Sequence, residues 1–192
     1  DQKNKALELI ATEINTQREE LKKSNNLDLV AGRKKGLTNA FLDRLELNEK
    51  RIDSMIKVLH DVVNLKDPVG EITGMNTLPN GLRVGQMRMP LGVVGIIFES
   101  RPNVCIEVAA LTIKSANGVI LRGGSDALNS NLALTAIIKS GLRKAGLPEN
   151  AVEIVEDTDR ESVKELLRMR DHIDIIIPRG GLNLIRFVEE HS

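Results

Sequence analysis

The sequence contains no tryptophan, no tyrosine and a single cysteine among its 192 residues, and its charges cancel. With aromatic residues at 2% and 27 basic against 27 acidic side chains, it lacks the stacking platforms and the positive charge that nucleic-acid-binding proteins use. One cysteine excludes an internal disulfide framework, and the three histidines lie far apart without the spacing of a zinc site. We therefore expect no nucleic-acid partner and no metal.

Long hydrophobic runs are also missing. No apolar stretch approaches the roughly 20 residues that a membrane-spanning helix needs, and the first residues lack the basic region and apolar core of a secretory signal. Hydrophobic residues nevertheless make up 41% of the chain, which is long enough to bury a sizeable core. These features predict a soluble, cytoplasmic protein without a membrane partner.

Residues 1–70 are expected to form a helical lead-in. Apolar residues recur there at steps of three and four between polar ones, which is the spacing of a helix with one buried face. A short helix is predicted over residues 37–45. Asn48 then stands where it can cap a further helix, whose apolar stripe runs from Ile52 to Val63.

Residues 82–90 predict a half-exposed strand or ribbon arm. Leu82 and Val84, and then Met87 and Met89, alternate there with polar or small residues. Such an arm could pair with a partner chain or form an edge of this domain, and the sequence leaves both possibilities open.

From residue 92 to residue 192 the pattern changes to short apolar runs separated by helical stretches. The runs are VVGIIF, GVIL, AVEIV and IDIII, and the predicted helices cover residues 103–117, 126–145, 160–170 and 182–190. Runs that are apolar on both faces are typical of a parallel sheet covered by helices on each side. We predict an α/β fold, a doubly wound, Rossmann-like parallel sheet preceded by an N-terminal helical segment.

The loop after the second run is RGGSD. In an open parallel sheet, ligands bind outside the carboxyl ends of the strands. Arg122 is predicted to end its strand at that edge, and Gly123 and Gly124 would let backbone amides approach an anion. Ser125 or Asp126 is expected to cap the next helix, whose N-terminus favours negative charge. The loop predicts a phosphate-binding corner.

Arg179, Gly180 and Gly181 repeat this arrangement after the fourth run. Either corner alone is weak evidence for a nucleotide site, because a strand followed by two glycines is often only a turn. Two such corners on one sheet edge, each with an arginine, favour nucleotide binding. Neither G-x-G-x-x-G nor a P-loop is present, so the nucleotide would be held differently from a standard fingerprint.

The loop after the first run, ESRPN, offers hydrogen-bond donors at the same edge. Ser100 or Asn103 could stabilise an oxyanion or contact a substrate; alternatively, either could merely cap the following helix. Cys105 lies within the first turn of that helix. It could be a nucleophile, but its apolar neighbours and the lack of a nearby histidine favour a small buried hydrophobe.

Four stretches, MPLGVVGIIFESRPN, GVILRGGSDALNSN, GLP and IDIIIPRGG, resemble the gamma-glutamyl phosphate reductases. These enzymes, also called glutamate-5-semialdehyde dehydrogenases, belong to the aldehyde dehydrogenase superfamily. The resemblance implies that NADPH reduces gamma-glutamyl phosphate to glutamate 5-semialdehyde with release of phosphate, in proline biosynthesis. It also implies an intermediate cysteine thioester, a homo-oligomer in the full-length protein and a functional link to glutamate kinase.

The resemblance assigns roles to residues of this chain. Ser100 stands where many aldehyde dehydrogenases place an oxyanion-binding asparagine. Arg122 stands where they place a lysine that contacts the adenosine ribose, and the change to arginine agrees with a preference for NADPH. Gly180 and Gly181 match the turn beside the cofactor pyrophosphate. The family's nucleophile lies in a Gly-x-Cys-His stretch beyond Ser192, so residues 1–192 are expected to form a cofactor-binding domain without the catalytic domain, inactive alone.

Two other functions stay open on the sequence. One is a non-catalytic, nucleotide-binding regulatory module. The other is an assembly element made of the amphipathic helices and the LRVGQMRM ribbon.

Overall fold

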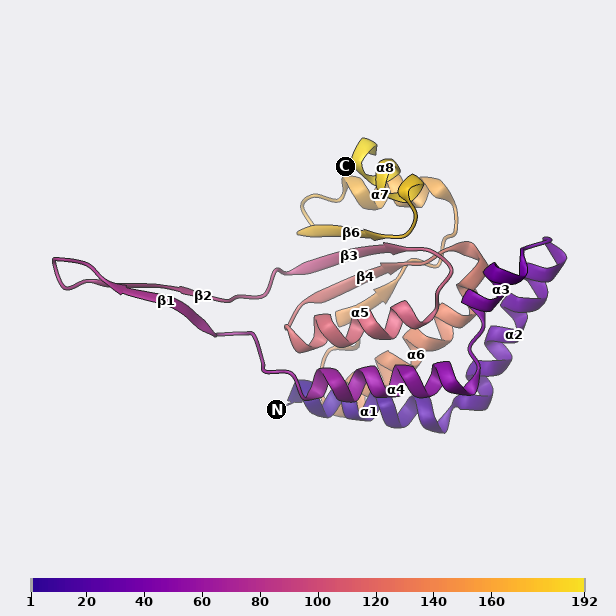
Figure 1. The fold of residues 1–192 in the computed structure, drawn as a ribbon, viewed down its shortest axis with the longest axis horizontal. Coiled ribbons are helices and arrows are strands. Elements are labelled where there is room, and N and C mark those ends of the chain that lie inside the picture. Colours follow the sequence, from indigo (N-terminus) through magenta and orange to yellow (C-terminus); the bar gives the residue numbers. More distant parts are fainter. Residues whose placement is uncertain (1, 192) are drawn as a thin grey trace.

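The computed structural model describes residues 2–191, apart from the side chain of Arg160, and shows a layered α/β body from which a long hairpin projects (Figure 1). Four helices precede the first strand: α1 (Gln2–Thr16), α2 (Arg18–Lys34), α3 (Asn39–Leu45) and α4 (Glu49–Val63).

Side-chain caps fix the starts of α3 and α4. The Thr38 hydroxyl accepts the amide N–H of Phe41, so α3 begins at Asn39, two residues later than predicted. The Asn48 side chain accepts the amide N–H of Arg51 at 3.1 Å, which confirms the predicted cap of α4. Local polar side chains therefore set these boundaries.

The sheet is parallel and has the order β5-β4-β3-β6. Its strands are β3 (Val93–Phe98), β4 (Gly118–Arg122), β5 (Val152–Ile154) and β6 (Ile175–Arg179). All four predicted apolar runs form strands. In chain order the sheet runs third, second, first, fourth, which is the order of a Rossmann half.

Helices cover both faces of the sheet, which confirms the predicted doubly wound architecture (Figure 1). On one face lie α5 (Asn103–Lys114) and α6 (Leu128–Ala145), with α1 and α4 packed outside them. On the other face lie α7 (Arg160–Arg168) and α8 (Leu182–His191). The helical lead-in is therefore an outer layer of the same body.

Strand β3 shows how the sequence builds the two cores. Val94, Ile96 and Phe98 are buried in the larger cluster with α5 and α6, whereas Ile97 is buried in the smaller cluster with α7 and α8. Successive side chains of a strand point to opposite faces, so a continuous apolar run supplies both cores.

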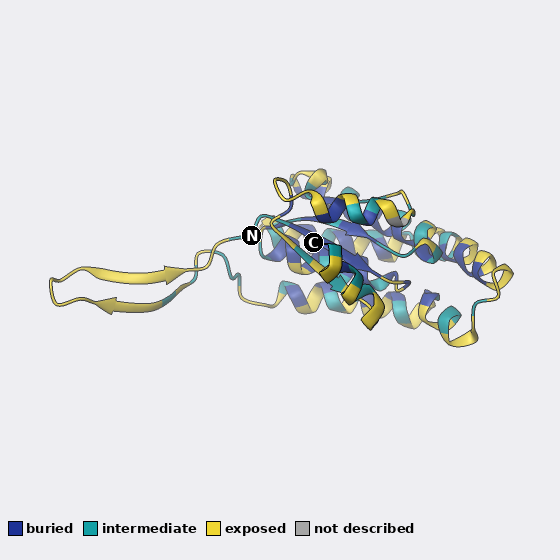
Figure 2. Ribbon diagram, turned by 90° about the horizontal axis from the view of Figure 1, so that it is seen from above, coloured by how far each residue is buried: buried dark blue, intermediate teal, exposed yellow. Residues whose placement is uncertain are grey.

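The hairpin consists of β1 (Ile72–Thr77) and β2 (Arg83–Met87), paired antiparallel. Nearly all of its residues are exposed (Figure 2). The predicted ribbon at residues 82–90 contains β2, but β1 was not predicted. The pairing register shifts between Thr73 and Asn76, where Gly74 has a positive φ of 62°, and this bulge hides the alternation of a strand.

Within residues 2–191, none of the helices combines the length and the apolarity needed to cross a membrane.

Candidate functional site

The loops that follow β3, β4 and β6 meet at one edge of the sheet. These strands are parallel, so their carboxyl ends lie on the same side, and β3 lies between the other two. The chain passes from β3 to β4 on one side and later returns to β6 on the other, which makes this a topological switch point. Both Arg-Gly-Gly corners therefore flank the ESRPN loop.

Arg122, in the first corner, binds backbone. Its side chain is 8% exposed, and Nη2 donates to the carbonyl oxygens of Thr158 and Asp159 at 2.9 Å each. Nη1 donates to the carbonyl of Gly123 at 3.1 Å. The guanidinium thus fastens the acidic loop 156–159 to the end of β4.

The two glycines of this corner are required by close packing. A Cβ on Gly123 would lie 2.2 Å from Nδ2 of Asn131 and 3.0 Å from Cζ of Phe98. A Cβ on Gly124 would lie 3.0 Å from Oγ of Ser100. Neither glycine has a positive φ. The missing side chains let the turn after β4 pack against the end of β3.

The predicted cap of the helix after this corner is wrong. Residues Ser125–Ala127 form a 3-10 turn, and neither Ser125 nor Asp126 caps α6. Instead, the buried carboxylate of Asp28, on α2, accepts the amide N–H groups of Asn129 at 3.1 Å and Ser130 at 2.8 Å. The sequence alone could not reveal this cap, because Asn129 and Ser130 lie 101 and 102 positions after Asp28. An internal anion already occupies this helix N-terminus.

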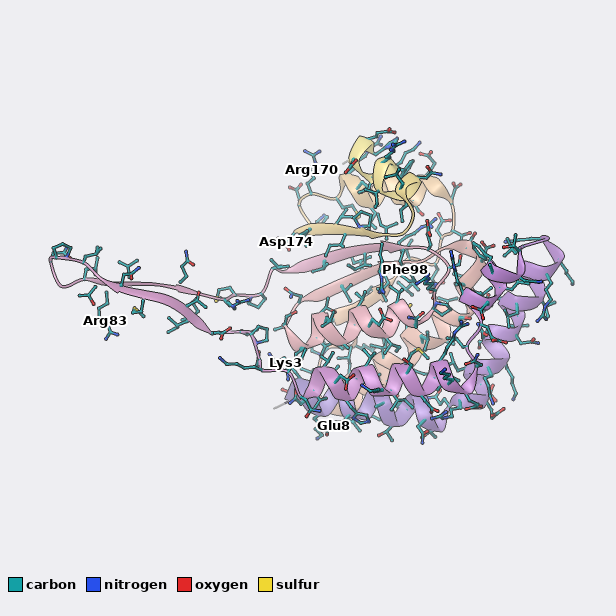
Figure 3. All side chains as sticks on the ribbon, viewed as in Figure 1. Lys3, Glu8, Arg83, Phe98, Arg170 and Asp174 are labelled. Atoms are coloured by element: carbon teal, nitrogen blue, oxygen red, sulfur yellow. The ribbon has the colours of Figure 1, made fainter. Side chains whose placement is uncertain are left out.

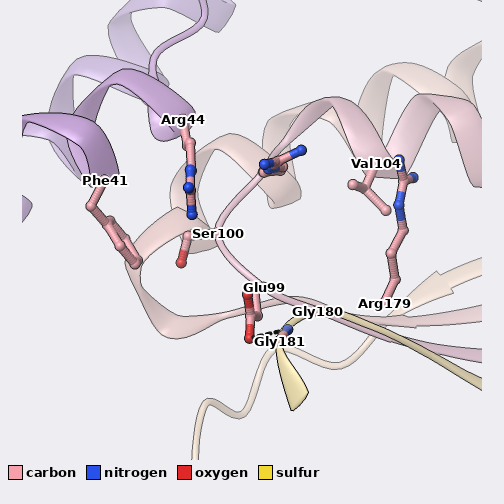
Figure 4. A pocket seen from close by; sticks show the side chains of 9 residues that line it. Phe41, Arg44, Glu99, Ser100, Val104, Arg179, Gly180 and Gly181 are labelled. Atoms are coloured by element: carbon pink, nitrogen blue, oxygen red, sulfur yellow. Dashed lines mark hydrogen bonds between the residues drawn. The ribbon is translucent and has the colours of Figure 1, made fainter. Parts of the chain in front are cut away.

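The second corner also holds an internal carboxylate. Oε1 of Glu99 accepts the amide N–H of Gly181 at 2.9 Å (Figure 4). A Cβ on Gly180 would lie 2.7 Å from Cδ of Glu99, so the glycine makes room for this side chain. Arg179 forms an ion pair with Glu107 of α5 at 2.6 Å. The amide N–H of Gly181 was predicted to bind an anion, and in the structure it donates to the carboxylate of Glu99.

The ESRPN side chains do not cap α5. That helix begins without a side-chain cap, which removes the alternative role of Ser100 and Asn103. Asn103 instead donates from Nδ2 to Oε1 of Glu107 at 2.6 Å. Ser100 is buried at the switch point and lines two cavities.

Cys105 is fully buried, and its thiol lies 3.4 Å from Oδ1 of Asn131. Burial raises the pKa of this thiol far above its usual range, because the thiolate would be desolvated. A nucleophile must be accessible and ionised. The nucleophile interpretation is therefore wrong, and the small buried hydrophobe is confirmed.

Two cavities open at this edge. The central cavity, of about 340 Å³, is lined by Phe41, Arg44, Glu99, Ser100, Arg101, Val104, Arg179, Gly180 and Gly181 (Figure 4). The outer cavity, of about 440 Å³, is lined by Gly124, by polar residues including Ser100, Arg122 and Ser125, and by apolar residues including Val163, Leu184 and Phe187. Glu99 and Ser100 line both, so the two cavities adjoin at the ESRPN loop.

A third cavity, of about 390 Å³, shares Arg44 and Arg101 with the central cavity. This α4 cavity is lined by Asp43, Arg44, Arg51, Ser54, Met55, Val58, Arg101, Asn103 and Glu107. Sequence reasoning missed the contribution of α3, because Phe41 and Arg44 carry no motif and their helix was predicted only as core. Glu99 and Arg101 were part of a quoted motif but had no assigned role.

Known proteins resemble the chain in sequence and in fold. No family model matches the chain. A gamma-glutamyl phosphate reductase from Persephonella marina is 54% identical over 192 residues, which is 100% of this chain and 43% of that protein. The crystal structure of gamma-glutamyl phosphate reductase from Thermotoga maritima superposes with a TM-score of 0.96 at 46% identity, covering 100% of this chain and 46% of that one.

The chain is a homologue of the gamma-glutamyl phosphate reductases. The resemblance read from the motifs is thus confirmed over the whole chain. The chain spans less than half the length of the reductases that it matches. A propionaldehyde dehydrogenase from Clostridium phytofermentans shares the fold, with a TM-score of 0.71 at 18% identity over 100% of this chain and 40% of that one.

Proposed function

We propose that this chain forms the NADPH-binding part of a reductase that converts gamma-glutamyl phosphate to glutamate 5-semialdehyde and phosphate in proline biosynthesis. The observation that carries the proposal is the meeting of both Arg-Gly-Gly corners and the ESRPN loop at the switch point, beside adjoining cavities. Homology to gamma-glutamyl phosphate reductases, with about half of all positions identical, supports this choice of substrate.

The outer cavity and the second corner fit the parts of a dinucleotide. The apolar side chains of Val163, Leu184 and Phe187 would hold the base. Arg122 and Ser125 line the same cavity and would hold the phosphorylated ribose. The carboxylate of Glu99 accepts the amide N–H of Gly181 and would be an internal stand-in for a cofactor phosphate, which supports an anion-binding role of this amide.

The groups at the ESRPN loop would serve the reacting carbonyl. Ser100, which lines the central cavity, would donate a hydrogen bond to the oxyanion, and Asn103, which donates to Glu107, would contact the substrate. When bound, NADPH supplies the hydride. The thioester cysteine is proposed to lie outside these 192 residues, since the buried Cys105 does not meet the requirements of a nucleophile. The chain alone should therefore be inactive.

The remaining expectations extend this proposal. The full-length protein would act in the cytoplasm, be functionally linked to glutamate kinase and form a homo-oligomer. The exposed hairpin supports the oligomer, because it carries large apolar side chains including Ile72, Met75, Val84 and Met87.

A cofactor titration of the purified chain tests the proposal. Saturable binding of NADPH, tighter than that of NADH, is expected from fluorescence titration. The Arg122→Ala variant should weaken NADPH far more than NADH, because only NADPH carries the ribose phosphate. If Arg122 only fastens loop 156–159, both cofactors should lose affinity equally, and the ribose-phosphate role would be excluded.

A further inference from the structure

Two guanidinium groups beside the ESRPN loop form no ion pair within the described part of the chain. Arg44 on α3 and Arg101 both line the central cavity and the α4 cavity. Both residues are exposed, and neither guanidinium forms a hydrogen bond or an ion pair with any other residue in the range 2–191. Figure 4 shows Arg44 reaching from α3 toward Ser100.

The other charged groups around these two cavities are already paired. Arg51 bonds Asp43 at 3.0 Å, and Arg179 bonds Glu107 at 2.6 Å. Glu99 accepts the amide N–H of Gly181. Asp43 and Glu107 are thus paired with arginines, whereas Glu99 bonds a neutral amide and keeps its charge. The charged side chains around the two cavities therefore sum to about one net positive charge beside Ser100, and Arg44 and Arg101 are the cations left without an ion pair.

We propose that Arg44 and Arg101 form the subsite for the phosphoryl group of an acyl phosphate substrate. This assignment rests on the proposed function. A phosphoryl group carries close to two negative charges, and planar guanidinium groups match its oxygens with paired hydrogen bonds. The amino-acid end of gamma-glutamyl phosphate carries one positive and one negative charge, so it leaves no comparable demand for two cations.

Position also favours the phosphoryl group. In an acyl phosphate it is bonded through oxygen to the carbon that is reduced, so it lies next to the oxyanion. Ser100, the proposed oxyanion donor, lines the same central cavity as Arg44 and Arg101. The two arginines would also hold the phosphate that the reaction releases.

Binding of inorganic phosphate to the chain tests the subsite. The dissociation constant would be measured by ³¹P NMR for the parent chain and for Arg44→Gln and Arg101→Gln. Each substitution should weaken phosphate binding by about tenfold to a hundredfold, the effect of losing a charge-assisted hydrogen bond. Arg83→Gln is the matched control, because it removes the same charge from the exposed hairpin, far from the cavities (Figure 3).

Further arms separate the possible outcomes. Arg44→Lys and Arg101→Lys should recover part of the affinity, and the thermal unfolding midpoint should stay unchanged in all variants. Equal phosphate binding by Arg44→Gln, Arg101→Gln and the parent would overturn the subsite. The subsite would also be overturned if these substitutions weakened the binding of L-glutamate but left the binding of phosphate unchanged. NADPH is titrated against the parent chain in parallel. If the parent binds NADPH but not phosphate, only the subsite is overturned. If it binds neither, both the proposed function and the subsite are overturned.

Discussion

Replacing Glu99 by glutamine should tighten the binding of NADPH. Oε1 of Glu99 accepts the amide N–H of Gly181 at 2.9 Å, so a cofactor phosphate that uses this amide must first displace the carboxylate. The carboxylate would also repel the phosphate from its new position. Glutamine keeps the shape of the side chain and can still accept the hydrogen bond, but it removes the charge.

The size of the effect follows from the two kinds of hydrogen bond. A bond to a charged acceptor contributes about 1.5–3 kcal/mol, and a bond between neutral groups contributes about 1 kcal/mol. Glu99 is exposed, so solvent screening places the difference near the lower end, at about 0.5 kcal/mol. Since 1.4 kcal/mol corresponds to a factor of ten, the affinity should rise by about twofold.

Fluorescence titration of NADPH at low ionic strength measures this change, and the gain should shrink as salt is added. Glu190→Gln is the matched control, because it removes an equal charge from the far end of α8, about 13 Å from Gly181 at 1.5 Å per residue. Its affinity should match that of the parent chain. Unchanged or weaker binding by Glu99→Gln would show that the cofactor does not compete with this carboxylate.

Two further predictions concern stability. Asp28→Ala should lower the free energy of unfolding by about 3 kcal/mol, measured with urea, because the buried amide N–H and hydroxyl of Ser130 and the partly buried amide N–H of Asn129 lose their acceptor. Burial raises the pKa of Cys105, so folding keeps the thiol protonated while the unfolded thiol ionises near pH 8.5. The free energy of unfolding should therefore fall above that pH, by up to about 1.4 kcal/mol per pH unit, and the slope should be smaller in Cys105→Ala.

Patterns that depend on local periodicity were predictable from the sequence. The apolar runs gave all four strands of the sheet, and the polar cap at Asn48 gave the start of α4. Both follow from neighbours within a few residues. The β1 strand was missed for the same reason, because the bulge at Gly74 interrupts the alternation that marks a strand.

Contacts between distant segments account for what was missed at the site. Asp28 replaces the predicted cap of α6, and α3 supplies Arg44 to the central cavity, although neither segment carries a motif. The role of Glu99 depends on its distance from Gly181, which lies 82 positions later. Sequence shows that a carboxyl group is present; only the fold shows which amide it occupies.

The edge of the sheet is therefore not a row of empty anion sites. Internal carboxylates bind the first amides of α6 and the amide of Gly181, and backbone carbonyls bind the guanidinium of Arg122. Such occupation holds the loops in place before any ligand binds, and it makes a negatively charged ligand compete with the protein itself. Arg44 and Arg101 have no such internal partner among the described residues, so an anion that binds them does not have to displace a protein group. The preference of the site for a negatively charged substrate should thus depend on Arg44 and Arg101 more than on the glycine-rich corners.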